Sequence, residues 1–152
     1  LMHESLYSVH GVRFDPRFDG CGSEDTDLRR QAAEYGIDAV PVPRAVIQEE
    51  ITMLRATLAS GFHRKLDAGV SGIVMLKKYS SPLAFTLGVL MQLPRRFIYL
   101  LRHWGRVVKA SAIRAENREE ILDVAIADLA VFLGLITGLC GYRGTYYSRN
   151  EE

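Results

Sequence analysis

The sequence predicts an all-α protein, a bundle of four to five helices preceded by an irregular N-terminal arm. Several segments carry apolar residues at helical spacing between capping and stop signals, and no long run alternates apolar and polar residues as a half-buried strand does. A nearly charge-free segment after residue 120 is long enough for a core helix. The 152 residues, 48% hydrophobic and 24% charged, are typical of one soluble domain and exclude disordered or collagen-like chains.

Residues 1–43 form the predicted arm. The stretch from Phe14 to Ser23 holds too many turn-forming residues for a regular element. Ser23 is followed by acidic residues, then basic residues and finally Gly36, an order that predicts one short helix. The Val-Pro repeat at 40–43 keeps the backbone extended, because each proline disfavours the helical conformation in the residue before it.

The helical domain is predicted over residues 44–140, and its first half contains three segments. Residues 44–60 place apolar side chains on one face and precede Gly61, which predicts a helix. Residues 70–79 are compatible with either a short strand or a helix. Ser81 and Pro82 open a helix that runs through Met91, with the serine as cap and the proline in the first turn.

The second half of this domain is predicted to hold a basic helix and an apolar helix. Pro94 begins a renewed helix with one apolar stripe and an exposed cationic remainder, which comprises Arg95, Arg96, Arg102, Arg106 and Lys109. Asn117 caps a helix to about Leu139 that we expect to be central and buried. Its apolar surface exceeds what one small chain covers, so we expect an oligomer, and we expect residues 141–152 to form a flexible tail.

Neither a membrane span nor a disulfide framework is expected. No stretch reaches about 18 uncharged apolar residues, and the nearest one, residues 129–142, contains three glycines and is better interpreted as a buried core helix. Cys21 and Cys140 lie far apart in contrasting surroundings and suggest neither a zinc site nor a secreted scaffold. We therefore expect a reducing, cytoplasmic location.

Charge is unevenly distributed, although the total is nearly balanced at 19 Lys and Arg against 18 Asp and Glu. Residues 61–118 carry 11 basic and 2 acidic side chains, net +9, whereas residues 1–60 and 119–152 are each net −4. A positive middle between acidic ends predicts either an anionic ligand or pairing of opposite faces within or between subunits.

Carboxylates inside the apolar helix are the strongest local feature. Glu120 and Asp123 are three positions apart, so their side chains project from one helical face about 5–6 Å apart at Cβ. Buried carboxylates need a cation, either Lys or Arg from the basic segment or a hard ion such as Mg²⁺. The alternative is that Glu119 and Glu120 are solvated residues favoured by the positive end of the helix dipole. Asp128, two turns into the apolar run, should be a paired buried charge or a ligand.

A second acidic pair, Glu49 and Glu50, lies on the predicted 44–60 helix. If this helix packs against the later one, within the chain or across a dimer, the pair could meet Glu120 and Asp123. Four carboxylates in one cleft repel one another unless divalent cations lie between them. Such a metal site suits phosphate chemistry, because the ions neutralise a polyphosphate and position a water for attack.

The order Ile47-Gln48-Glu49-Glu50, then Glu120-x-x-Asp123 and the segment that begins at Asp128, resembles the all-α nucleoside triphosphate pyrophosphohydrolases, which include MazG-like enzymes, dimeric dUTPases and phage nucleotide-modification domains. The resemblance covers roughly residues 44–140. It implies that Glu50, Glu120 and Asp123 are catalytic carboxylates and that Mg²⁺ is the cofactor. It also implies a nucleoside monophosphate and pyrophosphate as products. The implied metal ligands are Glu49, Glu50, Glu120, Asp123 and Asp128.

The resemblance also implies a nucleotide-binding role for four cations: Lys77, Lys78, Arg95 and Arg96. They would hold phosphate oxygens, with arginine favoured for contacts that use two nitrogens at once. The alternative for all four is a solvated helix face. His103 could serve as a base, but no partner lies at a spacing that requires it, so we expect a surface or packing role for it. Tyr99 could stack on a base, but its helical spacing favours packing in the core or an interface.

A second hypothesis belongs to a different class of function. Residues 95–109 combine cationic and aromatic side chains on an amphipathic helix, which also suits binding to an acidic protein partner, a nucleic acid or an anionic membrane surface. The chain would then be a non-catalytic helical subunit of a larger assembly, with its apolar segments in protein contacts.

Overall fold

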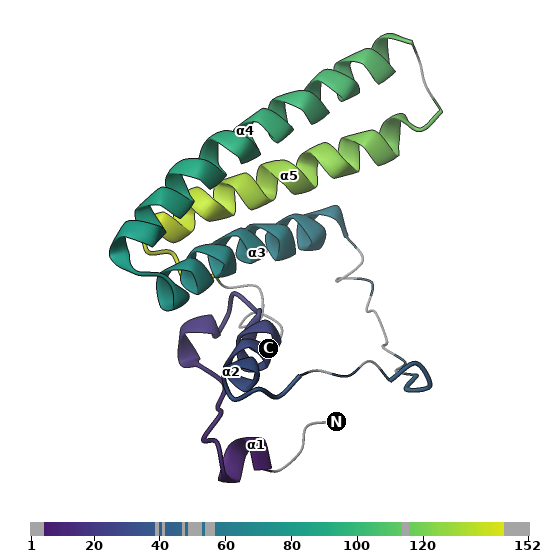
Figure 1. Ribbon diagram of the computed structural model, residues 1–152. Coiled ribbons are helices and arrows are strands. Elements are labelled where there is room, and N and C mark those ends of the chain that lie inside the picture. Colours follow the sequence, from purple (N-terminus) through teal and green to yellow (C-terminus); the bar gives the residue numbers. More distant parts are fainter. Residues whose placement is uncertain are drawn as a thin grey trace.

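A computed structural model describes residues 5–38, 40, 42–46, 48, 53, 57–113 and 116–144. The described part is all-α, as predicted, and contains no strand. Its elements are the helices α1 (Ser5–Ser8) and α2 (Glu24–Glu34) with the short 3-10 helix η1 (Pro16–Phe18) between them, followed by three long helices, α3 (Leu58–Tyr79), α4 (Pro82–Ala112) and α5 (Arg118–Leu139) (Figure 1).

The three long helices lie side by side in the order α3, α5, α4, and α4 and α5 form an antiparallel hairpin (Figure 1). Helix α5 packs against both neighbours, whereas α3 and α4 contact each other only slightly. The prediction that this segment forms the central helix is therefore confirmed. The prediction that it is buried is wrong for most of its length, because only Ala125, Ala130, Gly134 and Leu135 are buried.

Helix α3 joins parts of two predicted segments, because it starts within the last residues of the predicted 44–60 helix and continues through Gly61, which was predicted as its stop. Thr57 is its N-cap and accepts a hydrogen bond from the backbone N–H of Ser60 at 3.2 Å, and the ambiguous segment 70–79 is helical. The described residues among 44–57 are not helical, so the helix predicted over 44–60 is wrong for them. Val46 and Met53 are 85% and 87% exposed, so these two apolar side chains provide no packing that would favour a helix at their positions.

Helix α4 starts as predicted and then continues through the proline. Ser81 accepts a hydrogen bond from the backbone N–H of Ala84, and Pro82 occupies the first turn. The break predicted at Pro94 is wrong, because one helix extends from Pro82 to Ala112. Pro94 is exposed, so the carbonyl that loses its helical partner there remains accessible to water.

Helices α3 and α5 approach closely where glycine faces glycine. A Cβ atom added to Gly69 would lie 2.8 Å from the Cα of Gly134, and one added to Gly134 would collide with the carbonyl group of Leu66. One turn later, a Cβ on Gly138 would lie 3.2 Å from the Cα of Val70. The two backbones are therefore in contact over about one turn, at a separation that no larger residue allows.

The N-terminal unit (residues 5–38) packs beneath α3 (Figure 1). Leu6, Val12, Leu28 and Ala32 form one small core, and Phe18 and Cys21 form another with Val70 of α3. Gly144 reaches the same place from the C-terminal side. Its φ is +82°, and an added Cβ would lie 2.8 Å from the Cβ of Cys21, so glycine is required there for two reasons. The region predicted as an irregular arm is thus attached to α3.

Candidate functional site

The predicted carboxylates lie in three different settings. Glu120 and Asp123 are exposed in the first two turns of α5, three positions apart on one face. Asp128 is less buried than predicted, and its Oδ2 accepts a hydrogen bond from Nδ1 of His103 on α4, so this carboxylate has a side-chain partner. Glu49 and Glu50 lie outside the described residues.

A cleft of about 200 Å³ lies between α4 and α5 and contains one of these carboxylates. His103 and Arg106 line it from α4, and Glu120 with Val124 lines it from α5, while Asn117 and Ile121 complete the lining. Because Asp128 holds the ring of His103, the imidazole lies between a carboxylate partner and the open cleft. The cleft thus combines a guanidinium, an imidazole and a carboxylate.

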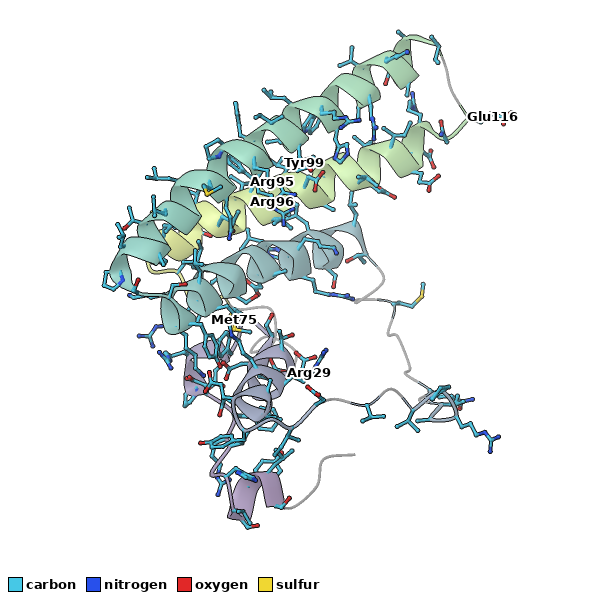
Figure 2. The ribbon with its side chains drawn as sticks, in the orientation of Figure 1. Arg29, Met75, Arg95, Arg96, Tyr99 and Glu116 are labelled. Carbon is cyan, nitrogen blue, oxygen red and sulfur yellow. The ribbon has the colours of Figure 1, made fainter. Side chains whose placement is uncertain are left out.

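A second cleft, of about 470 Å³, lies nearer the start of α4, and its lining carries more cationic side chains than that of the first cleft. Its lining comprises Gln92, Arg95, Arg96 and Tyr99, and the guanidinium carbon of Arg95 lies 5.7 Å from the centre of the Tyr99 ring (Figure 2). Both arginines are exposed. A pair of guanidinium groups beside an aromatic ring can bind phosphate oxygens and stack on a planar base.

The two clefts lie in line along one side of α4. Residues 92, 96, 99, 103 and 106 are spaced by three or four, so they lie on neighbouring turns of one helix face. From Arg95 to Arg106 the helix rises by about 16 Å. We call this side, from the Arg95 cleft to the Glu120 cleft, the polar face of the α4–α5 hairpin.

Lys78, one of the four cations selected for phosphate binding, has a different environment. Its Nζ lies 2.7 Å from an oxygen of Asp15 and 2.7 Å from an oxygen of Asp27, both in the N-terminal unit. Its side chain is only 14% exposed. Lys78 therefore joins the N-terminal unit to α3. Lys77 is exposed on the same helix.

The described residues meet part of what a divalent cation requires. They contain no group of three or more His, Cys, Asp or Glu side chains able to hold a metal ion together. Glu120 and Asp128 are eight residues apart, about 12 Å along α5, so they cannot share one ion. Glu120 and Asp123 can, and two carboxylates with water and substrate phosphates complete a typical Mg²⁺ shell. Glu120 and Asp123 therefore fit Mg²⁺ only as two of its ligands, with water and substrate phosphates as the others.

The sequence reasoning missed several residues of the polar face. His103, expected to be a surface or packing residue, is held by Asp128, and Gln92, Arg106 and Asn117 line the clefts. The common helical spacing of the α4 residues was present in the sequence. It was hidden by the break predicted at Pro94, which separated Gln92 from the residues after it. The contact between His103 and Asp128 joins two helices across 25 positions, and no local pattern in the sequence indicates it.

Comparison with models of protein families, with curated proteins and with solved structures found no match to this chain. Within the described part, α5 is long and apolar enough to cross a membrane, with a mean hydropathy of 2.0 over 18 residues, of which 22% are buried. A core helix of a soluble protein meets the same criterion of length and composition. No transmembrane span is therefore assigned.

Proposed function

We propose that this chain is a Mg²⁺-dependent nucleotide pyrophosphohydrolase that binds its substrate on the polar face of the α4–α5 hairpin. The observation that supports the proposal is the alignment of two clefts on one side of α4. The first offers two guanidinium groups and an aromatic ring, and the second offers a carboxylate together with an imidazole and a guanidinium. A nucleoside triphosphate has the matching parts, a planar base and a chain of anionic oxygens.

Each residue then has a role that follows from its chemistry. Arg95 and Arg96 hold phosphate oxygens, because a planar guanidinium donates two parallel hydrogen bonds. Tyr99 stacks on the base. Glu120 and Asp123 hold Mg²⁺, which when bound would neutralise the polyphosphate and lower the pKa of a bound water. The products are a nucleoside monophosphate and pyrophosphate.

The test is a panel of nucleoside triphosphates with pyrophosphate release as the readout, with and without Mg²⁺. We expect release only with Mg²⁺, and we expect Asp123→Ala and Glu120→Gln each to lower kcat by at least about 100-fold. Glu119→Gln is the matched control, since Glu119 is also exposed in the first turn of α5 but is neither in the cleft lining nor one of the two proposed Mg²⁺ ligands. A panel without turnover, or an equal loss in Glu119→Gln, contradicts the proposal.

A non-catalytic role of the same face is the second candidate. Helix α4 carries five Lys and Arg side chains and no Asp or Glu over its 31 residues, and all five are exposed. A face of this kind also suits an acidic protein partner, a nucleic acid or a membrane surface. Binding that falls steeply with salt and persists in Asp123→Ala, without turnover by the wild-type chain, would favour this candidate.

A further inference from the structure

The side of α4 opposite the polar face carries a long exposed apolar row. Its members recur at spacings of three, four or seven residues, which keeps them on one stripe of the helix. They are exposed by 47% to 72%, although all are large and apolar: Leu83, Leu87, Leu90, Phe97, Leu101 and Val108. The row extends for about 37 Å along α4. The face that α4 turns toward α5 is separate, since it contains Leu100 and Ala110, which are buried.

Helix α5 adds a parallel row on the same side of the hairpin. Leu122, Ile126, Leu129, Leu133 and Ile136 follow the spacing of four and three, and all are partly or largely exposed. Gly134 marks the side of α5 that faces α3, and Asp128 marks the side that faces α4. The Glu120 cleft occupies the third side, so this row lies on the fourth. The rings of Phe97 and Phe132, 5.9 Å apart, join the two helices beside it.

The apolar face of the hairpin, formed by these two rows, is a large apolar surface for a single chain to leave in water. Full burial of a large apolar side chain removes about 60–120 Å² from water, so these eleven partly or largely exposed side chains amount to on the order of 500 Å². The largest apolar patch on a typical monomer is about 300–600 Å². One partner of a stable protein interface contributes about 800 Å². The two rows therefore match the largest patch of a typical monomer, and the exposed side chains beside them, Ile98 at 64% and Trp104 at 38%, bring the face toward one half of a stable interface.

The distribution of charge on α4 and α5 indicates which partner covers the apolar face. Outside the two clefts, the cations of α4 are Arg102 and Lys109 and the exposed carboxylates of α5 are Glu119 and Asp123, and these lie at the same end of the hairpin, while residues 82–93 and 129–139 are uncharged. If α4 lies over α5 of a second copy with these ends together, cations meet carboxylates and uncharged ends meet each other. An anionic bilayer would attract α4 but repel the carboxylates of α5. The charge pattern thus favours a second copy.

We propose that two copies of this chain pair through the apolar face of the α4–α5 hairpin, about a two-fold axis that runs along the helices. The pairing closes a four-helix bundle in which each α4 packs between its own α5 and the α5 of the second copy. Both polar faces remain on the outside. This inference does not depend on the pyrophosphohydrolase proposal, because it uses the other side of the hairpin.

Mass in solution tests the pairing. Sedimentation velocity at about 20 μM should give twice the 17.0 kDa of one chain. Leu90→Glu places a charge in the face at a side chain that is 63% exposed in the single chain, and it should halve the mass. Val9→Glu is the matched control, since Val9 is 72% exposed in the N-terminal unit, and it should leave the mass doubled. A single-chain mass for the wild type, or a doubled mass for Leu90→Glu, overturns the proposal.

The orientation has its own test, which also serves if Leu90→Glu does not fold. Cys140 is exposed just after α5 and Cys21 is buried, so a nitroxide reagent labels the wild-type chain at Cys140. With like ends together, the two labels should lie within about 25 Å of each other by double electron–electron resonance. The reverse orientation separates them by about the 33 Å length of α5 or more, which overturns the proposed axis. Flotation with phosphatidylserine vesicles, combined with a single-chain mass, would instead identify a bilayer as the occupant.

Discussion

Lys78 pairs with two carboxylates that lie far from it in the sequence. Its ammonium group lies between Asp15 and Asp27, and Asp27 also accepts a hydrogen bond from the hydroxyl of Tyr79 at 2.7 Å. Asp27 is completely buried, and Gln31 donates to its second oxygen at 2.7 Å. A buried carboxylate with this many donors is stable, whereas removal of one donor would leave a buried charge partly uncompensated. This cluster holds the N-terminal unit against the end of α3.

The pKa values of the groups around this cluster reflect burial and hydrogen bonding. Burial lowers the pKa of Lys78, but hydrogen bonds to Asp15 and Asp27 outweigh it, so the net direction is upward. Burial and the hydrogen bond to Asp27 raise the pKa of Tyr79. Burial, aided by the charge of Asp67, raises the pKa of the Cys21 thiol to about 11. The hydrogen bond from Arg17 holds the pKa of the Asp15 carboxyl well below its usual value.

These directions predict how stability depends on pH. Cys21, Tyr79 and Lys78 hold their protons more tightly in the folded chain, so the stability they contribute is complete below their ordinary pKa values of 9.0, 10.0 and 10.5. It is lost as pH rises through the folded values. The free energy of unfolding in urea should therefore fall above about pH 9, by at most about 1.4 kcal/mol per pH unit for each group.

The same titrating groups provide the controls for this pH dependence. Tyr79→Phe removes one titrating group and should make the alkaline fall less steep. Asp15 has a lowered pKa, so its contribution should be lost only as pH falls below its ordinary 3.8. A free energy of unfolding that stays constant between pH 8 and pH 11 would contradict the role given to this cluster.

At the scale of the helix, the contact between α3 and α5 depends on two glycines. The atoms that a new Cβ on Gly134 would meet belong to the backbone of Leu66, which cannot rotate away as a side chain can. Gly134→Ala should therefore force the helices apart and lower the free energy of unfolding by about 1–3 kcal/mol. Urea denaturation measures the change.

Gly61→Ala provides the comparison. Gly61 is also in α3, but a Cβ there would meet nothing within 4 Å, so the exchange should gain up to about 1 kcal/mol of helix propensity. Similar effects of the two substitutions would mean that the close approach of α3 and α5 does not limit stability.

Capping and charge signals in the sequence predicted the starts of three helices. Ser81 with Pro82, and the segment after Asn117, mark the starts of α4 and α5, and the acidic start after Ser23 marks α2. The helix over 44–60 was wrong for its described residues before Leu58, and the break at Pro94 was wrong because solvent access at the proline, which a sequence does not show, allows the helix to continue. The glycines of α5 were visible, but their partner Gly69 lies 65 positions away, and no local pattern indicates that contact.

For the whole molecule, charge asymmetry was the most informative part of the sequence. The two explanations offered for it were an anionic ligand and the pairing of opposite faces, and Lys78 between Asp15 and Asp27 is an instance of pairing within the chain. Arg95 and Arg96 remain exposed at a cleft, available to a ligand. Both arginines were selected, with Lys77 and Lys78, as what the family resemblance implies. The sequence could not assign Lys78, because that contact joins elements about 50 residues apart.

The fluorescence emission of Trp104 reports on the proposed pairing. Trp104 is the single tryptophan, it lies on the apolar row of α4 between Leu101 and Val108, and it is 38% exposed in one chain. Pairing would bury it, so dilution from about 50 μM to 50 nM should shift its emission to longer wavelength if the pair dissociates.

If the pair instead unfolds only as a unit, the same 1,000-fold dilution should lower the apparent stability by up to about 4 kcal/mol and lower Tm. Leu90→Glu should show neither dependence, because it begins as a single chain. Emission and Tm that are both independent of concentration in the wild type would mean that the apolar face is not covered by a second copy.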